Sequence, residues 1–372
     1  MKTIKTNVLV IGGGPSGSTA ARQLALGGEK VVLLEKNLKF QKPCGGGIFI
    51  DAFYEFDLPR SLITKEVKTI EIVSPDNDSV TVDISENPIG IVDRQQFDAT
   101  LRELAQEAGA VLIEAKAQDI TVIPDGVVVQ AKTHEGSLLC IEADYLIAAD
   151  GVNSRIRKIL LSETPSRLLT YYADIVEKHS NVCRFFFGSD LSPGYYAWVF
   201  PHYRGINIGF MKNSKQHQIQ QLYERLLTKA SLEVKQIKPK AYYIPQWKPM
   251  TLYRDHVFYI GDSASLVMPF TYEGIYYALK SGSLAAQAIL KNDPGLYEKK
   301  WNTLYLKKFK FLHLLQTIFL RNDWFALQMG RLYRHPQFQQ AVIGYWRGSR
   351  KPSGMFITLW KVLKAFILYR KV

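Results

Sequence analysis

The sequence has few cysteines and no uncharged run long enough to cross a bilayer. Its three cysteines, Cys44, Cys140 and Cys183, are too widely spaced for a disulfide framework or a metal site, so we expect no bound metal. No run of about 18 residues lacks charge, so no helix is predicted to span a membrane. The first apolar run is too short for a secretory signal. These absences favour a globular protein of the reducing cytoplasm.

Acidic residues are nearly missing from the last part of the chain. Residues 301–372 contain 13 lysines and arginines but a single acid, Asp323. The first 300 residues hold 34 basic and 33 acidic residues, so the net charge of +13 belongs almost entirely to this segment. Since the segment is also rich in aromatic and aliphatic residues, it indicates an anionic membrane surface as a partner. A nucleic-acid surface is the competing interpretation, but the long aliphatic clusters disfavour it, and we expect no nucleic acid.

Residues 355–372 are predicted to form an amphipathic helix that lies in the membrane interface. Lys361 and Lys364 lie inside the apolar stretch, and each would cost roughly 2.5–3.5 kcal/mol at a bilayer centre, so the helix should not span it. The alternative is a helix that packs back on the protein or forms a dimer contact. The membrane interpretation places the protein peripherally on the inner face of the cell membrane.

The N-terminal stretch predicts a strand, a glycine turn and a helix. Residues 7–11 are apolar and mostly β-branched, which is typical of a buried parallel strand, and residues 18–26 follow a helical pattern. The turn between them reads Gly12-x-Gly14-x-x-Gly17. Gly12 permits a tight turn, Gly14 lets the backbone approach a pyrophosphate, and Gly17 lets the helix pack closely on the strand.

A second predicted strand, residues 31–34, ends in Glu35. The Glu35 carboxylate can accept hydrogen bonds from a ribose hydroxyl, while the N-terminus of the first helix offers N–H groups and a partial positive charge to phosphates. Strand, glycine turn, helix and acid in this order predict an adenine-dinucleotide site.

Helices and strands alternate through most of the remaining chain. Residues 36–47 are predicted as a loop that ends in Pro43-Cys44-Gly45-Gly46-Gly47, whose backbone can lie flat against a ligand. Arg94, in the first turn of a helix, is poorly placed for the helix dipole, so it is either a ligand contact or a surface arginine. Strands are predicted within 67–84, around a turn at 75–78, and at 111–123, 126–132, 138–142, 144–149 and 256–260. Helices are predicted at 95–108, from Gly274 to about 290, and from 301 onward. The region 168–250 is predicted to be rich in strands, with one helix near 215–230.

This pattern predicts an α/β (α+β) fold with a discontinuous cofactor domain and an inserted β-rich domain. The aromatic residues of 168–250 suit the lining of an apolar tunnel. The predicted domains are a Rossmann-like FAD-binding domain (1–66, 90–167 and 253–295), a β-rich substrate domain (67–89 and 168–252) and a C-terminal basic helical region (296–372).

Four features in this order resemble the flavoproteins that include the aromatic hydroxylases. They are the glycine turn with Glu35, Arg94 before its helix, Asp150-Gly151 followed by Arg157, and Gly261-Asp262. The resemblance implies that the dinucleotide is FAD, with the Gly-Asp pair at its ribityl and pyrophosphate region. It covers residues 1 to about 290.

Two further motifs are similar to the geranylgeranyl reductase family. Residues 193–201 match its P-x-x-Y-x-W-x-F-P signature at every fixed position, and residues 43–47 are similar to its cysteine-glycine loop near the flavin. Residues 261–264 and 269–275 look like its second flavin motif, with one departure, because Tyr272 stands where a glycine is usual. The resemblance implies cofactor contacts from Gly12, Gly14, Pro15, Ser16, Gly17, Glu35, Lys36, Cys44, Gly45, Gly46, Arg94, Asp150, Gly151, Gly261, Asp262, Gly274 and Ile275.

The family implies saturation of carbon–carbon double bonds in an isoprenoid lipid such as a geranylgeranyl or polyprenyl chain. The reaction needs a hydride from reduced flavin N5 and a proton for the other alkene carbon, because an isolated alkene accepts hydride poorly. Cys44 and Tyr196 are the two candidate proton donors. The expected substrate contacts are Tyr196, Trp198, Phe200, Pro201 and Tyr272.

Two other functions share these motifs. A flavin monooxygenase or halogenase acting on an apolar aromatic or polyene substrate would have the same fold and most of the same flavin contacts. A non-catalytic flavin-bearing protein at the membrane is the third interpretation. The electron donor is left open between NAD(P)H, ferredoxin and a quinol, because no second dinucleotide motif is seen.

Overall fold

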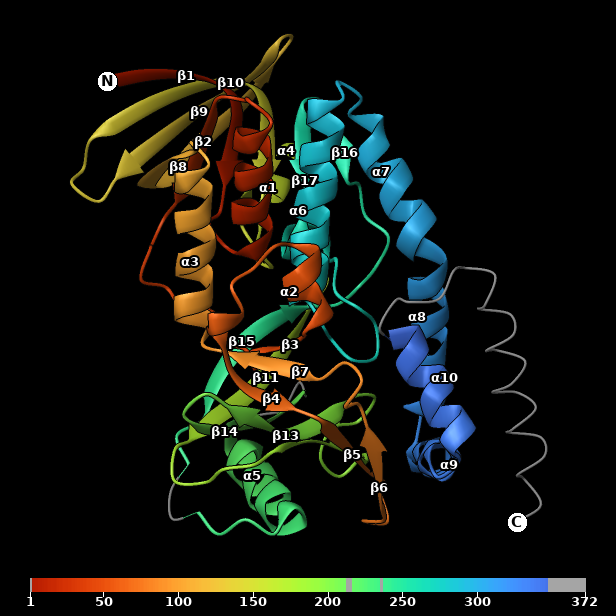
Figure 1. Ribbon diagram of the computed structural model, residues 1–372. Helices are drawn as coiled ribbons and strands as arrows, with labels where there is room; N and C mark the ends of the chain where they lie inside the picture. Colours follow the sequence, from red (N-terminus) through yellow and green to blue (C-terminus); the bar gives the residue numbers. More distant parts are fainter. Residues whose placement is uncertain (1, 212–215, 235–236, 347–372) are drawn as a thin grey trace. The chain divides into compact units, whose positions relative to one another are not determined.

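The computed structural model describes residues 2–211, 216–234 and 237–346. These residues form two compact units, each assembled from three stretches of chain (Figure 1). The cofactor unit comprises Met1–Pro43, Arg94–Arg167 and Ile244–Leu306, and the sheet unit comprises Cys44–Asp93, Leu168–Tyr243 and Lys307–Val372. The predicted helix at 355–372 lies outside the described residues.

The predicted domain boundaries differ from these units at several places, of which the two largest concern residues 44–66 and the C-terminal helices. Residues 44–66, expected with the cofactor domain, belong to the sheet unit, and so does the C-terminal chain from Lys307. The reason is strand pairing, because β3 (Gly47–Phe49) and β4 (Ile63–Val67) both pair with β7 (Ile89–Val92) in a small sheet of their own. Which unit binds cofactor and which binds substrate stays a prediction of the sequence.

The cofactor unit is built on five parallel strands. Its elements are β1 (Lys2–Ile11), α1 (Pro15–Leu26), β2 (Val31–Glu35), α3 (Arg94–Glu107), β8 (Val111–Ile123), β9 (Gly126–Thr133), β10 (Leu138–Ala148), α4 (Arg155–Leu161), β16 (Tyr253–Arg254), β17 (Val257–Tyr259), the 3-10 turn η2 (Gly261–Ala264), α6 (Ile275–Leu290), α7 (Gly295–Trp301) and the π-helical turn η3 (Asn302–Leu306). The parallel strands run in the order β8-β2-β1-β10-β17. Their apolar residues are buried on both sides, as the exposed fractions of Val8, Leu9 and Val10 (each 0%) show.

Helices α1, α3 and α6 lie side by side in the cofactor unit (Figure 1). The close approach of α1 and α6 depends on Gly282, where a Cβ would lie 2.2 Å from the Ser16 carbonyl oxygen.

One expectation is corrected here, because the strands predicted at 138–142 and 144–149 form the single strand β10. Its register with β1 is continuous from Lys2 to Ile11, so the polar residue Asp144 does not interrupt it.

The sheet unit contains a seven-stranded sheet in the order β15-β11-β14-β13-β12-β5-β6 and the three-stranded sheet β3-β7-β4. Helix α5 covers one face of the large sheet, and its Leu222, Tyr223 and Leu226 pack against Ile208 and Phe210. Besides β3, β4 and β7, the elements are α2 (Asp51–Glu55), η1 (Arg60–Leu62), β5 (Thr69–Val73), β6 (Ser79–Asp83), β11 (Arg167–Ile175), β12 (Val182–Phe187), β13 (Tyr196–His202), β14 (Gly205–Met211), α5 (Gln216–Ala230), β15 (Lys240–Pro245), α8 (Lys307–Phe319), α9 (Asp323–Tyr333) and α10 (Pro336–Trp346).

The C-terminal helices pack on the sheet unit. The Asp323 carboxylate accepts hydrogen bonds from the backbone N–H and the hydroxyl of Ser189, each at 2.7 Å. Arg334 forms an ion pair with Asp78, in the turn between β5 and β6. At Gly330 a Cβ would lie 1.9 Å from the Ser74 hydroxyl, so α9 approaches this edge of the sheet as closely as glycine permits. Among the described residues, no helix is long and apolar enough to cross a membrane.

Candidate functional site

The predicted cofactor residues of the cofactor unit follow the ends of neighbouring parallel strands. Gly12 follows β1, Glu35 ends β2, Asp150 follows β10 and Gly261 follows β17. Because carboxyl ends of parallel strands meet at one edge of a sheet, the structure brings these four residues to that edge, where dinucleotides bind in such folds.

The glycine turn is crowded at two positions and open at one. A Cβ at Gly12, where φ is +111°, would lie 2.2 Å from the Ala149 carbonyl oxygen, and one at Gly17 would lie 1.9 Å from the Gly12 carbonyl oxygen. At Gly14 no described atom comes within 4 Å of such a Cβ. Gly14 is also the N-cap of α1, and no described side chain caps this helix. The turn therefore leaves room for a phosphate beside the start of α1, which opens with Pro15 and the buried Ser16.

The Glu35 carboxylate lies beside this turn. Its Oε2 accepts a hydrogen bond from the Gly13 N–H at 2.7 Å, and its Oε1 accepts one from the Asn37 N–H at 3.0 Å. These bonds orient the carboxylate and leave further lone pairs for a ribose hydroxyl. The next residue, Lys36, is exposed.

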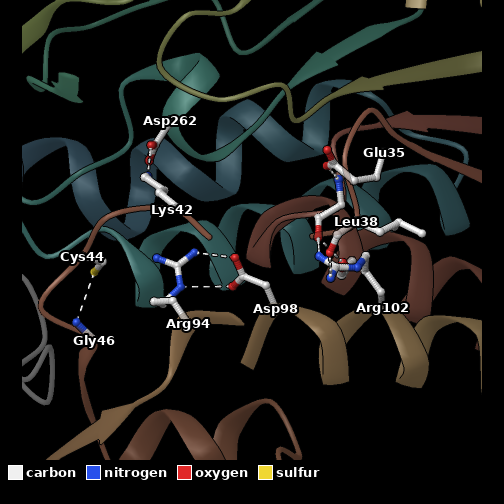
Figure 2. A network of polar contacts seen from close by, with 11 residues as sticks. Glu35, Leu38, Lys42, Cys44, Gly46, Arg94, Asp98, Arg102 and Asp262 are labelled. Carbon is white, nitrogen blue, oxygen red and sulfur yellow. Dashed lines mark hydrogen bonds and ion pairs between the residues drawn. The ribbon is translucent and has the colours of Figure 1, made fainter. Parts of the chain in front are cut away.

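Helix α3 directs a stripe of alternating charge into the cofactor unit (Figure 2). Arg94 forms a two-pronged ion pair with Asp98, with N···O distances of 3.1 and 2.8 Å, and both side chains are buried. Arg102, one turn further along, donates to the carbonyl oxygens of Gly13 (3.1 Å) and Leu38 (3.0 Å) and so holds the glycine turn in place. Sequence reasoning missed Arg102, although the four-residue spacing from Arg94 through Asp98 was a usable signal.

Asp150 caps helix α4. Its carboxylate accepts hydrogen bonds from the Ser154 hydroxyl (2.6 Å) and from the N–H groups of Arg155 (2.8 Å) and Ile156 (3.1 Å). Burial raises the pKa of Asp150, and these bonds oppose that rise. The neighbouring Gly151 has φ +83° and no described atom within 4 Å of a Cβ position, so the backbone there is accessible to a ligand.

The Gly261-Asp262 pair lies against α1 and the loop after β2. At Gly261, where φ is +59°, a Cβ would come within 2.7 Å of the Ser16 hydroxyl, so the two phosphate-binding turns are in contact. The Asp262 carboxylate forms an ion pair with Lys42, which sequence reasoning missed (Figure 2). Lys42 thus reduces the repulsion that Asp262 would exert on a bound pyrophosphate.

The second flavin motif ends at the start of α6, as predicted. Gly274 is the N-cap, no described side chain caps the helix, and Ile275 is its first residue. Tyr272 has φ +57°, in the left-handed region. This conformation is the physical reason why glycine suits the position, and it means that Tyr272 is held under backbone strain.

In the sheet unit, the cysteine-glycine loop contacts the signature strand. The Gly46 N–H donates to Cys44 Sγ at 3.3 Å, and the Gly46 carbonyl oxygen accepts from the Val92 N–H at 3.0 Å. A Cβ at Gly46, where φ is +71°, would lie 2.4 Å from the Val92 carbonyl oxygen, so only glycine allows this attachment. A Cβ at Gly45 would lie 3.2 Å from the ring of Phe200.

Strand β13 presents Tyr196, Trp198 and Phe200 on one face of the large sheet, opposite the face that α5 covers. The ring of Phe185 on β12 lies 5.1 Å from that of Tyr196 and 4.8 Å from that of Phe200, and the Trp198 ring lies 6.4 and 6.2 Å from these same two rings, between centroids. We call Phe185, Tyr196, Trp198 and Phe200 the aromatic face. Pro201 does not join them, because strand alternation places it with Ala197 and Val199 on the α5 side.

These observations fit an adenine dinucleotide. The chain offers an open glycine turn at an uncapped helix, a carboxylate for a ribose and a second uncapped helix start at Gly274. The family model described as "FAD binding domain" matches residues 5–290. The protein is therefore an FAD-dependent flavoprotein, as the sequence predicted.

Similar proteins narrow this class. The chain is 32% identical to a chloroplastic geranylgeranyl diphosphate reductase of Nicotiana tabacum, over 85% of this chain and 75% of the relative. It is 30% identical to a digeranylgeranylglycerophospholipid reductase of Methanothrix thermoacetophila, over 80% of this chain and 83% of the relative. A geranylgeranyl bacteriochlorophyll reductase-like structure from Thermoplasma acidophilum superposes with a TM-score of 0.78 and 25% identity, over 89% and 92% of the two chains. The chain belongs to the geranylgeranyl reductase family of FAD-dependent oxidoreductases.

The fold is shared more widely. A p-nitrophenol 4-monooxygenase from Pseudomonas putida superposes with a TM-score of 0.74 at 15% identity, over 94% and 98% of the two chains. This likeness confirms the expected aromatic-hydroxylase type of fold, with both helices and sheets.

Replacing Glu35 with Gln should weaken FAD binding. The variant loses a charged acceptor worth roughly 1.5–3 kcal/mol, so the dissociation constant should rise at least about tenfold. Quenching of flavin fluorescence during titration of the apoprotein measures it. Glu114→Gln is the matched control, because Glu114 also accepts a backbone N–H, from Leu38 at 3.1 Å. Equal FAD dissociation constants for the two variants would show that Glu35 does not contact the cofactor.

Tyr272→Gly should be more stable than Tyr272→Ala. Both variants lose the ring, but only glycine relieves the left-handed strain, which costs about 1 kcal/mol. Urea unfolding followed by circular dichroism gives the difference in free energy of unfolding. Equal stabilities would show that the strain at Tyr272 is negligible.

Proposed function

We propose that the protein saturates carbon–carbon double bonds of an isoprenoid chain of the geranylgeranyl or polyprenyl kind. The observation that carries the proposal is the aromatic face, with Phe200 packed against the glycine loop that holds Cys44. An extended face of rings suits an apolar chain without polar handles. The substrates named for the two reductase relatives support the same class.

In such a reduction, the aromatic face and the proton donors have different roles. Reduced FAD supplies the hydride when it is bound. The aromatic face orients the alkene and excludes water from it. Cys44 holds a proton at Sγ, in a loop whose geometry the contact between Gly46 and Val92 maintains, and Tyr196 is the other proton donor on this unit. Proton donation matters because the alkene carbon that does not receive hydride must be protonated.

Cys44→Ser should retain FAD and slow alkene reduction by roughly a hundredfold, the usual contribution of a general acid. The measurement is single-turnover reduction of geranylgeranyl diphosphate by dithionite-reduced enzyme, with products followed by mass spectrometry as additions of two hydrogens. Cys140→Ser is the control, because Cys140 is a half-buried thiol on β10.

Tyr196→Phe under the same conditions separates the two donors. If alkene reduction is slow in Tyr196→Phe and unchanged in Cys44→Ser, Tyr196 is the proton donor. If no isoprenoid gains hydrogen and the reduced enzyme instead consumes oxygen rapidly with an apolar substrate, the protein is a monooxygenase and the proposed function is wrong.

We also propose that the reductase works at an anionic membrane surface. Helix α8 carries the exposed residues Lys307, Lys310, Leu314 (53% exposed) and Ile318 (39%), and the exposed Arg321 follows two residues after the helix ends at Phe319. Trp324, the second residue of α9, is 50% exposed. Cationic side chains around exposed apolar ones are typical of helices that lie in a lipid interface. The concentration of positive charge in residues 301–372 supports the same partner.

Lys310→Glu/Arg321→Glu should reduce sedimentation with phosphatidylglycerol vesicles at least about tenfold, since each basic residue near such a surface contributes about 1 kcal/mol. Lys116→Glu/Lys132→Glu is the matched control, with two exposed lysines of the cofactor unit. Binding should also weaken with salt. Equal loss in both double variants, or binding that ignores salt, would contradict a role for α8.

A further inference from the structure

One edge of the Trp198 indole packs against the neighbouring strand. Gly209 faces Trp198 across the β13–β14 ladder. A Cβ at Gly209 would come within 2.4 Å of Trp198 Cζ2 and 2.7 Å of its Cη2. Any other residue at Gly209 would push the indole away from the sheet, so this glycine permits the observed ring plane.

A chain of hydrogen bonds holds the adjacent Nε1–H on the same edge of the indole. The Trp198 Nε1–H donates to Asn207 Oδ1 at 2.7 Å, and the Asn207 amide Nδ2–H donates to Asp174 Oδ1 at 2.7 Å. Asn207 is only 2% exposed. The three residues come from adjacent strands, β13, β14 and β11, and Asn207 lies directly opposite Asp174 in register. The remaining carboxylate oxygen of Asp174 lies 3.6 Å from the ammonium of Lys240 at the edge of the sheet.

The chemistry of the three groups allows only one arrangement. An indole N–H can only donate, and an ionised carboxylate can only accept. The Asn207 amide must therefore turn its oxygen to Trp198 and its nitrogen to Asp174. An apolar side chain at position 207 would leave the buried indole N–H of Trp198 without a partner, which is unfavourable. It would also remove one hydrogen bond from the exposed Asp174 carboxylate. Asp174 thus determines the orientation of the amide, and the amide determines the orientation of the indole.

We propose that Asn207 and Asp174 are positioning residues for substrate binding, which act through Trp198. The proposal rests on the proposed function, because it takes the aromatic face as the surface that contacts the isoprenoid chain. A ring held along this edge, by the close approach of Gly209 and the hydrogen bond to Asn207, presents one orientation to that chain and keeps the binding geometry preorganised. Loss of the amide should weaken substrate binding and change the chemical step little, because neither residue is a proton donor to the alkene in this arrangement.

Asn207→Leu should raise the KM for geranylgeranyl diphosphate about tenfold, as expected for one lost hydrogen bond and an unpaired buried partner, with kcat nearly unchanged. The enzyme is the dithionite-reduced holoenzyme. Asn87→Leu is the matched control, because Asn87 is also buried and donates to an aspartate, Asp51, at 2.7 Å. A control that raises KM equally would show that both variants act only through stability, and it would overturn the inference.

A second readout does not depend on turnover. In protein labelled with 15N-tryptophan, the indole N–H signal of Trp198 is the one that disappears in Trp198→Phe. This signal should move in Asn207→Leu and stay in place in Asn87→Leu. In the Trp198→Phe background, Asn207→Leu should no longer change KM, because phenylalanine has no N–H to orient.

A swapped pair tests the direction of the hydrogen bonds and serves if Asn207→Leu does not fold. Asn207→Asp alone places two carboxylates together and should raise KM. Adding Asp174→Asn should restore KM, because the carboxylate at position 207 still accepts the indole N–H while the amide at position 174 donates to it. Failure of this rescue, or an unmoved indole signal, overturns the inference. A wild-type enzyme that reduces no isoprenoid would instead overturn the proposed function, and the indole signal would still report on the hydrogen bonds.

Discussion

Close backbone contact around the start of α1 is the constraint on which the cofactor unit depends. The carbonyl oxygens of Gly12, Ala149 and Ser16 each occupy space that a Cβ on a neighbouring segment would need. Gly17 and Gly282 therefore let α1 approach both β1 and α6, and Gly12 lets the turn approach the end of β10. These contacts bring the start of α1 next to the ends of several parallel strands, at the edge of the sheet where dinucleotides bind in such folds.

Charged side chains then stabilise the turns at the carboxyl-terminal edge of the parallel sheet. Arg102 bonds the carbonyl oxygen of Gly13, Glu35 bonds its N–H, and Lys42 neutralises Asp262. These contacts oppose the like charges that a carboxylate and a pyrophosphate would bring together. The same logic explains the pairing of Arg94 with Asp98, because a buried guanidinium requires a partner.

Under the proposed function, the two faces of the large sheet separate stability from binding. One face packs its aliphatic and aromatic residues against α5, as a conventional core. The other face carries the aromatic residues of the family signature, with the Asn207–Asp174 pair among them. Alternation along β13 assigns Tyr196, Trp198 and Phe200 to one role and Ala197, Val199 and Pro201 to the other. A buried amide on an otherwise apolar face is costly, so its presence there favours a role in orientation.

The sequence by itself determined the FAD class, the family and nearly every element of the cofactor unit, because these depend on local signals. Apolar periodicity, a glycine turn and an acid at a strand end act over a few residues, and the structure confirms β2, α3 and α6 close to their predicted bounds. It also confirms β1 and α1, but β1 begins five residues and α1 three residues before the predicted start. Only the tertiary structure decided that residues 44–66 join the sheet unit, that Arg102 and Lys42 contact Gly13 and Asp262, and that Asn207 accepts a hydrogen bond from Trp198. Those contacts join residues up to 220 positions apart, as Lys42 and Asp262 are, and no pattern of neighbours along the chain encodes such a distance. Strand register and helix packing set them, and both depend on the whole folded chain.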